Sequence, residues 1–499
     1  MTLYLLGLDG ASLNTIAESL GRTPLPNFQR VLKNGTPAEL LSTYPYVTAP
    51  AWTTIFTGVN PGKHGIFEMF EIEKGGKIIP SNMRSSDATF LWDYLTWANK
   101  KSLVVGVPFV YPAPKIKGIF VSGRFSPKLS CFPEKIAEEF DLSGFQYDSM
   151  SMEEKTEKLV GHGSMEVSKE IVGGLERRIR AMEKLMDSET DWDVVVLVDG
   201  LPDDLLHISY GDHETVDEMY RALDGLIGIV LERMKEGDSL LIFSDHGFRD
   251  VNRVLFMNEW LLSKGYTAVH ESALAKIIFF LGLDWESLGR PGAATHLYRF
   301  LLEHFPWLLN RAKNNLRSSM IAERNEQMQS SKVTAFSINE PIAWVRVSDH
   351  SKKDISTDQV LQELGELKRD GTLKNIFRSE EIFRGKYISK APGEILVEAS
   401  DGWLIDTLRW NKRRLTGKPL YTKKGVHKRE GLFVVYSGEN TSSPNVSSPA
   451  DKCRVHDIVP TVLSMLNLPI PVNLDGKVLS GVGRAAKSPP QLLDVTQRL

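Results

Sequence analysis

The chain has 499 residues, more than one hydrophobic core usually organises, so we expect two domains or one large domain with an insertion. Its formal net charge is −3 and its charged residues are well mixed, which gives no sign of a basic surface for nucleic acid or of an acidic tail. The two cysteines, Cys131 and Cys453, are too few for a disulfide framework and favour a reducing, cytoplasmic compartment.

The first segment runs from a short apolar stretch, 3–8, directly into Asp9, and no basic region precedes it. This pattern predicts a buried strand rather than a signal peptide. The most apolar later segment, 275–283, has about half of the ~20 residues that a membrane span requires. We therefore expect no membrane association.

Continuous apolar runs that end in polar turns indicate parallel strands covered on both faces. Helical patterns follow these runs, and the alternation predicts a doubly wound α/β fold whose mostly parallel sheet is flanked by helices. The predicted strands are 3–8, 102–107, 119–122, 194–198, a run from 239 that ends at the Asp245-His246 pair, and 431–437. The predicted helices are 12–20, 88–99, 152–187, 216–235, 355–369 and one near 456–465.

The alternation lapses between residues 258 and 417, and we interpret this stretch as a cap inserted into the core. The core then comprises residues 1–257, with a possible small insertion at 70–190, and residues 418–499. Within the predicted cap, the apolar clusters IIFF and FPWLL indicate packing or, alternatively, an apolar substrate wall.

The segment from Tyr44 to Met69 combines a Thr-Ala-Pro turn, an apolar helical pattern and an Asn-Pro-Gly turn. Thr48 lies two residues before Pro50, and proline favours the first turn of a helix. Because the N–H groups of a first turn bind anions, a substrate phosphate could lie beside the Thr48 hydroxyl. The alternative is an ordinary N-cap threonine.

Acidic and imidazole side chains follow the ends of apparent strands, where open α/β sheets place their chemistry. Two of them are four residues apart on a predicted helical turn and point the same way, and two others are adjacent at a strand end. Three aspartates and three histidines suit a pair of divalent metal ions, with Zn2+ the first choice and Mn2+ or Mg2+ the alternatives. These residues are Asp9, Asp203, His207, Asp245, His246 and His427.

Charge supports this pairing, since two dications would balance the three aspartates and an ionised Thr48. One metal would lower the pKa of the Thr48 hydroxyl and the other would stabilise the leaving oxygen. Each residue also has a structural alternative: a lone aspartate often caps a helix, and His427 could be a surface histidine. We interpret His64 as part of a turn and His456-Asp457 as a helix start.

Six motifs follow one another along the chain: LGLDGAS, VTAPAWTTIFTGVNPGKHGIFE, DGLPDDLLH, FSDHG, GVHKREGLFVVYSG and HDIVPTVLSMLNLPIPVNLDGKVL. With them the chain resembles the alkaline phosphatase superfamily, most closely its type I phosphodiesterase/nucleotide pyrophosphatase branch. The resemblance implies that Thr48 is the nucleophile and forms a phospho-threonine, with Thr53 and Thr54 as alternatives. It also implies two metal sites, one held by Asp9, Thr48, Asp245 and His246 and the other by Asp203, His207 and His427.

The chain departs from this branch at Ala51, where nucleotide pyrophosphatases have an asparagine that binds the phosphate. Backbone N–H groups, the metals, or a basic residue such as Lys63 or Arg124 would then stabilise the phosphate. We expect a metal-dependent phosphoric ester hydrolase that acts on small diesters or pyrophosphates. The alternatives are a phosphomonoesterase or phosphomutase on the same scaffold, and a metal-stabilised binding protein without turnover.

Overall fold

The structure of the chain is a computed structural model. It describes residues 1–72, 78–145, 164–267, 331–336, 340–348, 355–407, 414–419, 423–438, 453–479 and 492–493. Several predicted features lie outside these residues, namely the apolar segment 275–283, the IIFF and FPWLL clusters, and the start of the helix expected from residue 152.

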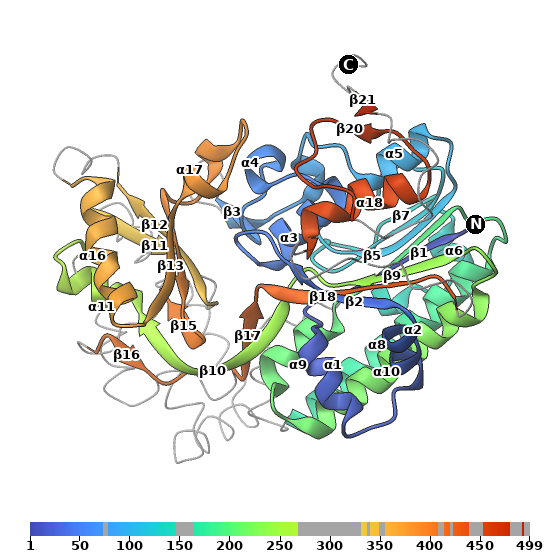
Figure 1. Ribbon diagram of the computed structural model, residues 1–499, viewed down its shortest axis with the longest axis horizontal. Coiled ribbons are helices and arrows are strands. Elements are labelled where there is room, and N and C mark those ends of the chain that lie inside the picture. Colours follow the sequence, from blue (N-terminus) through green and yellow to red (C-terminus); the bar gives the residue numbers. More distant parts are fainter. Residues whose placement is uncertain are drawn as a thin grey trace, which may run out of the picture.

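Among the described residues, a nine-stranded sheet forms the centre of the larger part of the molecule, with the order β19-β2-β18-β9-β1-β8-β5-β6-β7 (Figure 1). Its five central strands are parallel: β9 (Ser239–Phe243), β1 (Leu3–Leu8), β8 (Val194–Asp199), β5 (Ser102–Val107) and β6 (Gly118–Ser122). The remaining strands are β2 (Thr36–Leu41), β18 (Glu430–Tyr436), β7 (Cys131–Phe132) and β19 (Cys453–Arg454). Strand β18 is antiparallel to both of its neighbours, and β7 is antiparallel to β6. The prediction of a mostly parallel sheet is confirmed.

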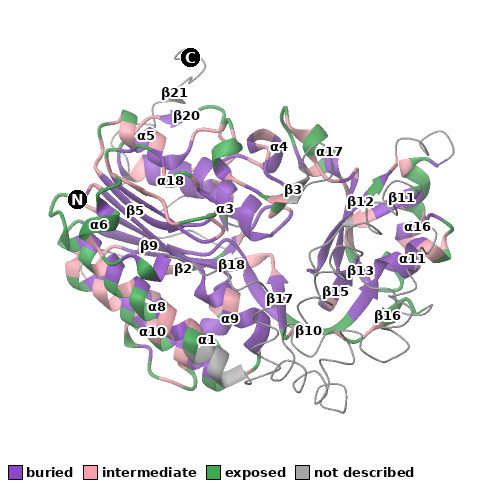
Figure 2. Cartoon of the chain, turned by 180° about the vertical axis from the view of Figure 1, so that it is seen from behind, coloured by how far each residue is buried: buried purple, intermediate pink, exposed green. Residues whose placement is uncertain are grey.

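Helices cover both faces of this sheet (Figure 1). One face carries α1 (Leu13–Leu20), α2 (Pro26–Asn34), α8 (Ser164–Asp187), α9 (Leu201–Ser209) and α10 (His213–Arg233). The other carries α3 (Thr48–Thr57), α4 (Pro61–His64), α5 (Leu91–Trp97) and α18 (Ile458–Met465). Strand β1 is buried on both of its faces. Tyr4 and Leu6 pack in one hydrophobic core, and Leu3 and Leu5 pack in a second core on the other face of the sheet. Figure 2 shows the central strands buried, while α8 and α10 have exposed residues on their outer sides.

Local sequence explains where individual helices begin and end. Helix α1 begins after Ser12, whose side chain accepts a hydrogen bond from the Thr15 N–H. Helix α5 is shorter than the predicted range 88–99. Asp93 accepts from the Phe90 N–H at its start, and Asn99 beyond its end has a left-handed φ of 58°.

A second sheet stands beside the large one, in the region predicted as a cap (Figure 1). Its order is β11-β12-β14-β13, and all of its pairs are antiparallel. The strands are β11 (Val333–Phe336), β12 (Ile342–Val347), β13 (Leu373–Arg378) and β14 (Ile395–Ala399), packed with α11 (Met257–Ser263) and α16 (Thr357–Arg369). The boundaries of the cap at 258 and 417 stay predictions.

One long strand, β10 (Gly247–Phe256), runs from the core to the cap (Figure 1). Near its start it pairs with β17 (Gly425–Lys428), and near its end it pairs with β15 (Gly402–Asp406) and β16 (Thr416–Gly417). The segment 70–190, for which the sequence left a small insertion open, contributes β5, β6 and β7 to the main sheet. The short elements β3 (Phe70–Ile72), β4 (Ile78–Pro80), α6 (Ile136–Glu139), α17 (Ser379–Ile382), β20 (Ile470–Pro471) and β21 (Leu492–Leu493) complete the described part.

Candidate two-metal active site

The six aspartates and histidines predicted from the sequence converge at the carboxyl ends of the central strands. Asp9 directly follows β1, and Asp245 and His246 follow β9. Asp203 and His207 share one side of α9, which follows β8, and His427 lies on β17. All six are buried, with exposed fractions between 0% and 9%. Their side chains form two groups of three: Asp9, Asp245 and His246 are compact enough to hold one ion, and Asp203, His207 and His427 lie within 3.4 Å of one another.

The first group consists of Asp9, Asp245 and His246. His246 Nε2 lies 3.1 Å from Asp245 Oδ2 and 3.6 Å from Asp9 Oδ1. These same three atoms are buried without a hydrogen-bond partner among the described residues. Because a buried polar atom without a partner is unfavourable, three that face one another fit a cation that would bind them all. The donor set therefore fits a divalent metal ion.

The opposite atom of each of these side chains is held by the protein. Asp9 Oδ2 accepts a hydrogen bond from Trp52 Nε1 at 3.0 Å, and Asp245 Oδ1 accepts from the Gly10 N–H at 3.2 Å. His246 Nδ1 lies 3.3 Å from the Gly247 carbonyl oxygen, so Nδ1 carries the proton and Nε2 offers its lone pair. Such outer contacts orient metal ligands.

Two glycines make these contacts possible. A Cβ on Gly7 would lie 2.5 Å from the ring of Trp52, so only glycine lets the indole pass β1 and reach Asp9. Gly10 has a left-handed φ of 77°, which turns its N–H toward Asp245.

The second group consists of Asp203, His207 and His427. His427 Nε2 lies 3.1 Å from both Asp203 Oδ1 and His207 Nε2, and His207 Nε2 lies 3.4 Å from Asp203 Oδ1. Ligands of a tetrahedral zinc ion at ~2.0–2.1 Å lie roughly 3.3 Å from one another, so this triangle also fits a metal. His427 Nδ1 lies 3.2 Å from the Tyr46 carbonyl oxygen, which leaves Nε2 as the ligand atom.

Burial and charge set the protonation of the ligands in the metal-free protein. Burial, reinforced by Asp245, raises the pKa of Asp9 well above its usual value, and burial raises the pKa of Asp245 to about 7. Burial, reinforced by His427, lowers the pKa of His246, which keeps its imidazole neutral. Burial opposes ionisation of Asp203, but His207 and His427 outweigh it and lower the pKa of that carboxyl. Metal binding therefore displaces protons from the first group.

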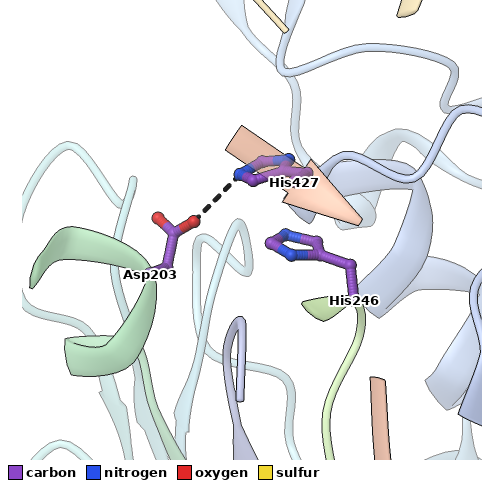
Figure 3. A group of neighbouring side chains, drawn as sticks. All are labelled: Asp203, His246 and His427. Atoms are coloured by element: carbon purple, nitrogen blue, oxygen red, sulfur yellow. Dashed lines mark hydrogen bonds and ion pairs between the residues drawn. The ribbon is translucent and has the colours of Figure 1, made fainter. Parts of the chain in front are cut away.

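The two groups contact each other through one histidine of each. The rings of His246 and His427 stack with centroids 3.7 Å apart and planes inclined by 25°. Figure 3 shows these rings with Asp203, whose carboxylate points toward His427. The three side chains come from α9, from the turn before β10 and from β17, and together they form a further close group.

Thr48 is the first residue of α3, and the residue that caps this helix is Val47. The alternative of an ordinary N-cap threonine is therefore wrong. Among the described residues, no hydrogen bond or ion pair joins Thr48 to the six aspartates and histidines. Its chain neighbours do contact them: the Tyr46 carbonyl oxygen lies against His427, and Trp52 donates to Asp9.

The alternative nucleophiles are engaged in α3 itself. The hydroxyls of Thr53 and Thr54 donate to the carbonyl oxygens of Ala49 and Pro50, at 2.7 Å and 2.8 Å. His64 is fully buried, lies 3.1 Å from the Thr54 hydroxyl and accepts from the Ile66 N–H. It closes the turn, as interpreted from the sequence.

The basic candidates Lys63 and Arg124 are paired with carboxylates. Lys63 Nζ lies 2.5 Å from Asp475. Arg124 lies 2.7 Å from Asp204 and 3.4 Å from Asp203 Oδ2, so it contacts a candidate metal ligand. Asp457 accepts from the Arg454 N–H ahead of α18, which confirms the helix start.

Sequence reasoning missed Glu340. This residue is 3% exposed, and its Oε2 accepts a hydrogen bond of 2.9 Å from the His427 N–H. Its Oε1 lies 2.6 Å from Lys423 Nζ. No spacing in the sequence links a glutamate in the predicted cap to histidines that lie far away along the chain.

Comparison with known proteins shows the family of the chain and agrees with its fold. Residues 3–429 match the type I phosphodiesterase/nucleotide pyrophosphatase family, and the chain belongs to this family. It is thus a phosphoryl hydrolase of the phosphodiesterase/pyrophosphatase type. A search of curated proteins found no match.

Solved structures share the fold at low identity. Murine ectonucleotide pyrophosphatase/phosphodiesterase 5 is 14% identical with a TM-score of 0.52, covering 94% of this chain and 95% of its own. An inactive threonine-to-alanine variant of that murine protein was solved in complex with AMP. Phosphonoacetate hydrolase from Sinorhizobium meliloti 1021, solved with phosphonoformate, is 13% identical with a TM-score of 0.56, covering 92% and 94%. Among the described helices, none has the length and apolar character to cross a membrane.

Proposed function

We propose that the chain hydrolyses small phosphodiesters or pyrophosphates with Thr48 as the nucleophile and two divalent metal ions, through a phospho-threonine intermediate. One observation carries the proposal: Asp9 Oδ1, Asp245 Oδ2 and His246 Nε2 are buried, face one another and lack partners among the described residues. Asp203, His207 and His427 offer a second ligand triangle beside them.

The metals would lower the pKa of the attacking hydroxyl and neutralise charge on the phosphate. The chain's own residues do the rest. In the proposed reaction the Thr48 oxygen forms a bond to phosphorus, the bond between phosphorus and the leaving-group oxygen breaks, and the proton of the Thr48 hydroxyl passes to the departing alcohol or phosphate. Water then cleaves the phospho-threonine. The N–H groups of Thr48 and Ala49 have no backbone acceptor among the described residues, so they are placed to donate to a phosphate oxygen.

The charges near the site favour a diester. A monoester brings a second negative charge that further cations must neutralise. Lys63, Arg124 and Lys423 each form an ion pair, with Asp475, Asp204 and Glu340 respectively. In addition, Ala51 supplies no side-chain donor. A phosphomonoesterase or phosphomutase is the alternative on the same site.

Zn2+ is the proposed metal, since mixed imidazole and carboxylate ligands suit it, with Mn2+ or Mg2+ as alternatives. A small-molecule phosphate ester is the proposed substrate. A cytoplasmic location is part of the proposal, and the two cysteines, both free, suit a reducing compartment.

The test compares initial rates of the zinc-loaded protein on bis(p-nitrophenyl) phosphate and on p-nitrophenyl phosphate. We expect faster cleavage of the diester, loss of turnover in Thr48→Ala with metal content retained, and near-normal turnover in the matched control Thr53→Ala. Preference for the monoester would move the assignment to a phosphatase or mutase. Bound metal without cleavage of either ester would favour a binding protein.

A further inference from the structure

Glu340 brings the predicted cap into contact with the second group of ligands. It lies just before β12, and its own carbonyl oxygen accepts from the Ile405 N–H in β15. Its carboxylate binds the His427 N–H with Oε2 and the Lys423 ammonium with Oε1. Its two oxygens also lie 3.8 Å from His207 Nδ1 and 3.8 Å from His427 Nδ1, too far for hydrogen bonds.

The carboxylate stands behind the two imidazoles rather than between them. The Nε2 atoms of His207 and His427 face Asp203, whereas Glu340 lies on their Nδ1 sides. These Nδ1 atoms face backbone acceptors. His207 Nδ1 lies 3.2 Å from the Gly425 carbonyl oxygen, and His427 Nδ1 lies 3.2 Å from the Tyr46 carbonyl oxygen. Glu340 is thus placed to support the ligands, not to replace one.

His207, Glu340 and His427 are close enough together to suggest another ion. Lys423 argues against it, because its ammonium lies 2.6 Å from Glu340 Oε1 and 2.9 Å from His207 Nδ1. A cation therefore already occupies this place. A charged carboxylate with a charged partner is thus sealed behind the histidines.

We propose that Glu340 is a positioning residue of the second metal site: through the His427 N–H, the cap holds His427 in ligand geometry beside His207, and Lys423 balances the charge of the buried carboxylate. The inference rests on the proposed function, because it requires a metal at Asp203, His207 and His427. It goes further in making a cap residue part of the metal site. A buried ion pair of this kind fixes geometry more than it adds stability.

The test is a Co2+ titration of the metal-free protein, read from the visible absorption of the bound ion and from chelator competition. Wild type should bind two ions with different spectra, since one group has two histidines and the other has one. Glu340→Gln should weaken the two-histidine site by about 10–100-fold and change its spectrum, and leave the other site within a few-fold. Equal affinities for wild type and Glu340→Gln would overturn the inference.

Glu398→Gln is the matched control. Glu398 is 4% exposed on β14, and it ties the cap to the core by accepting hydrogen bonds from the hydroxyls of Tyr44 and Tyr46. Its loss should lower the melting temperature and leave both Co2+ affinities unchanged. If it weakens the same site as Glu340→Gln does, general loosening of the cap explains the effect and the specific role of Glu340 is wrong.

A second variant covers the case in which Glu340→Gln fails to fold. Glu340→Gln combined with Lys423→Met removes both buried charges together, so neither partner is left unpaired. We expect a folded protein with the same weakened two-histidine site, and wild-type affinity would overturn the inference. Failure of the proposed function is distinguishable, since wild type would then bind fewer than two ions or bind two without Thr48-dependent cleavage.

Discussion

The imidazoles of His246 and His427 stack on each other with centroids 3.7 Å apart. Each ring belongs to a different group of ligands, since His246 Nε2 faces Asp9 and Asp245, and His427 Nε2 faces Asp203. An ion that fixes one ring therefore fixes the surface against which the other ring packs. The two metal sites should be coupled through this contact.

Asp245→Asn tests the coupling. The amide would keep the hydrogen bond from Gly10 with its oxygen, and it would then place its N–H2 group before His246 Nε2. We expect the metal affinity of the first site to fall by about 100-fold and that of the second site by a smaller factor. Turnover should fall at least as strongly as the affinity of the first site. Metal content by elemental analysis after gel filtration measures this. Asp193→Asn is the control, because Asp193 lies at the opposite end of β8 and binds Lys100. An unchanged number of bound metal ions in Asp245→Asn would show that Asp245 is not a ligand.

Trp52→Phe removes the hydrogen bond from the indole to Asp9 Oδ2 and leaves that oxygen buried without its partner. Metal affinity of the first site should fall by about 10-fold or more, because the carboxylate loses its orientation. Chelator competition on the folded variant measures it. Trp92→Phe truncates another buried tryptophan, 2% exposed and stacked on Phe90, and should leave the affinity unchanged. Similar losses in both variants would point to packing instead.

Glu68→Gln should change how stability depends on pH. Burial raises the pKa of Glu68 from 4.5 to about 7, and its Oε2 is buried without a partner among the described residues. The folded-state pKa is raised, so the stability from protonated Glu68 is complete below about pH 4.5 and is lost as pH rises through about 7.

Glutamine would remove this loss and still accept from Trp344 Nε1. Near pH 8 we expect the free energy of unfolding of the variant, measured by urea denaturation, to exceed that of wild type by on the order of 1 kcal/mol. Near pH 5 the two free energies should match. Glu39→Gln, exposed on β2, should show no such trend. A constant difference across this range would exclude titration of Glu68 as the cause.

Metal removal should destabilise the protein. Ions that bind only the folded chain stabilise it by about 2.7 kcal/mol per site at a free concentration of about 100 times Kd. We therefore expect a chelator to lower the melting temperature and added Zn2+ to restore it, with Thr48→Ala behaving like wild type. Scanning calorimetry with and without chelator measures this. An unchanged melting temperature would mean that no ion binds the folded chain more tightly than the unfolded one.

The sequence predicted the central sheet and the convergence of the six candidate ligands because both follow local rules. Continuous apolar runs mark parallel strands, and side chains just past the carboxyl ends of neighbouring strands must meet at one edge. Asp9, Asp245 and His246 needed no more than this, and Asp203 and His207 needed only the spacing of one helical turn. His427 was predicted by resemblance and residue type, and β17, which carries it, was not predicted.

Other features depend on contacts between distant segments. Strand β2 has a mixed pattern of buried and exposed residues, and the antiparallel strands of the cap have no periodicity that sets them apart. Trp52 and Glu340 act on the site only because the chain folds Trp52 past Gly7 and the cap against β17. A single sequence does not encode such tertiary partners in its spacing.

Strand β10 makes the boundary between core and cap a poor place for a graft. Its first residue follows His246, and its last pairs with Asp406, so the same strand connects the candidate site to β15. Inserting a single residue would turn every later side chain of the strand to the other face. A transplanted cap must therefore bring its own crossing strand and a glutamate that reaches the host histidines. Chimeras that exchange the predicted cap should therefore begin upstream of Gly247.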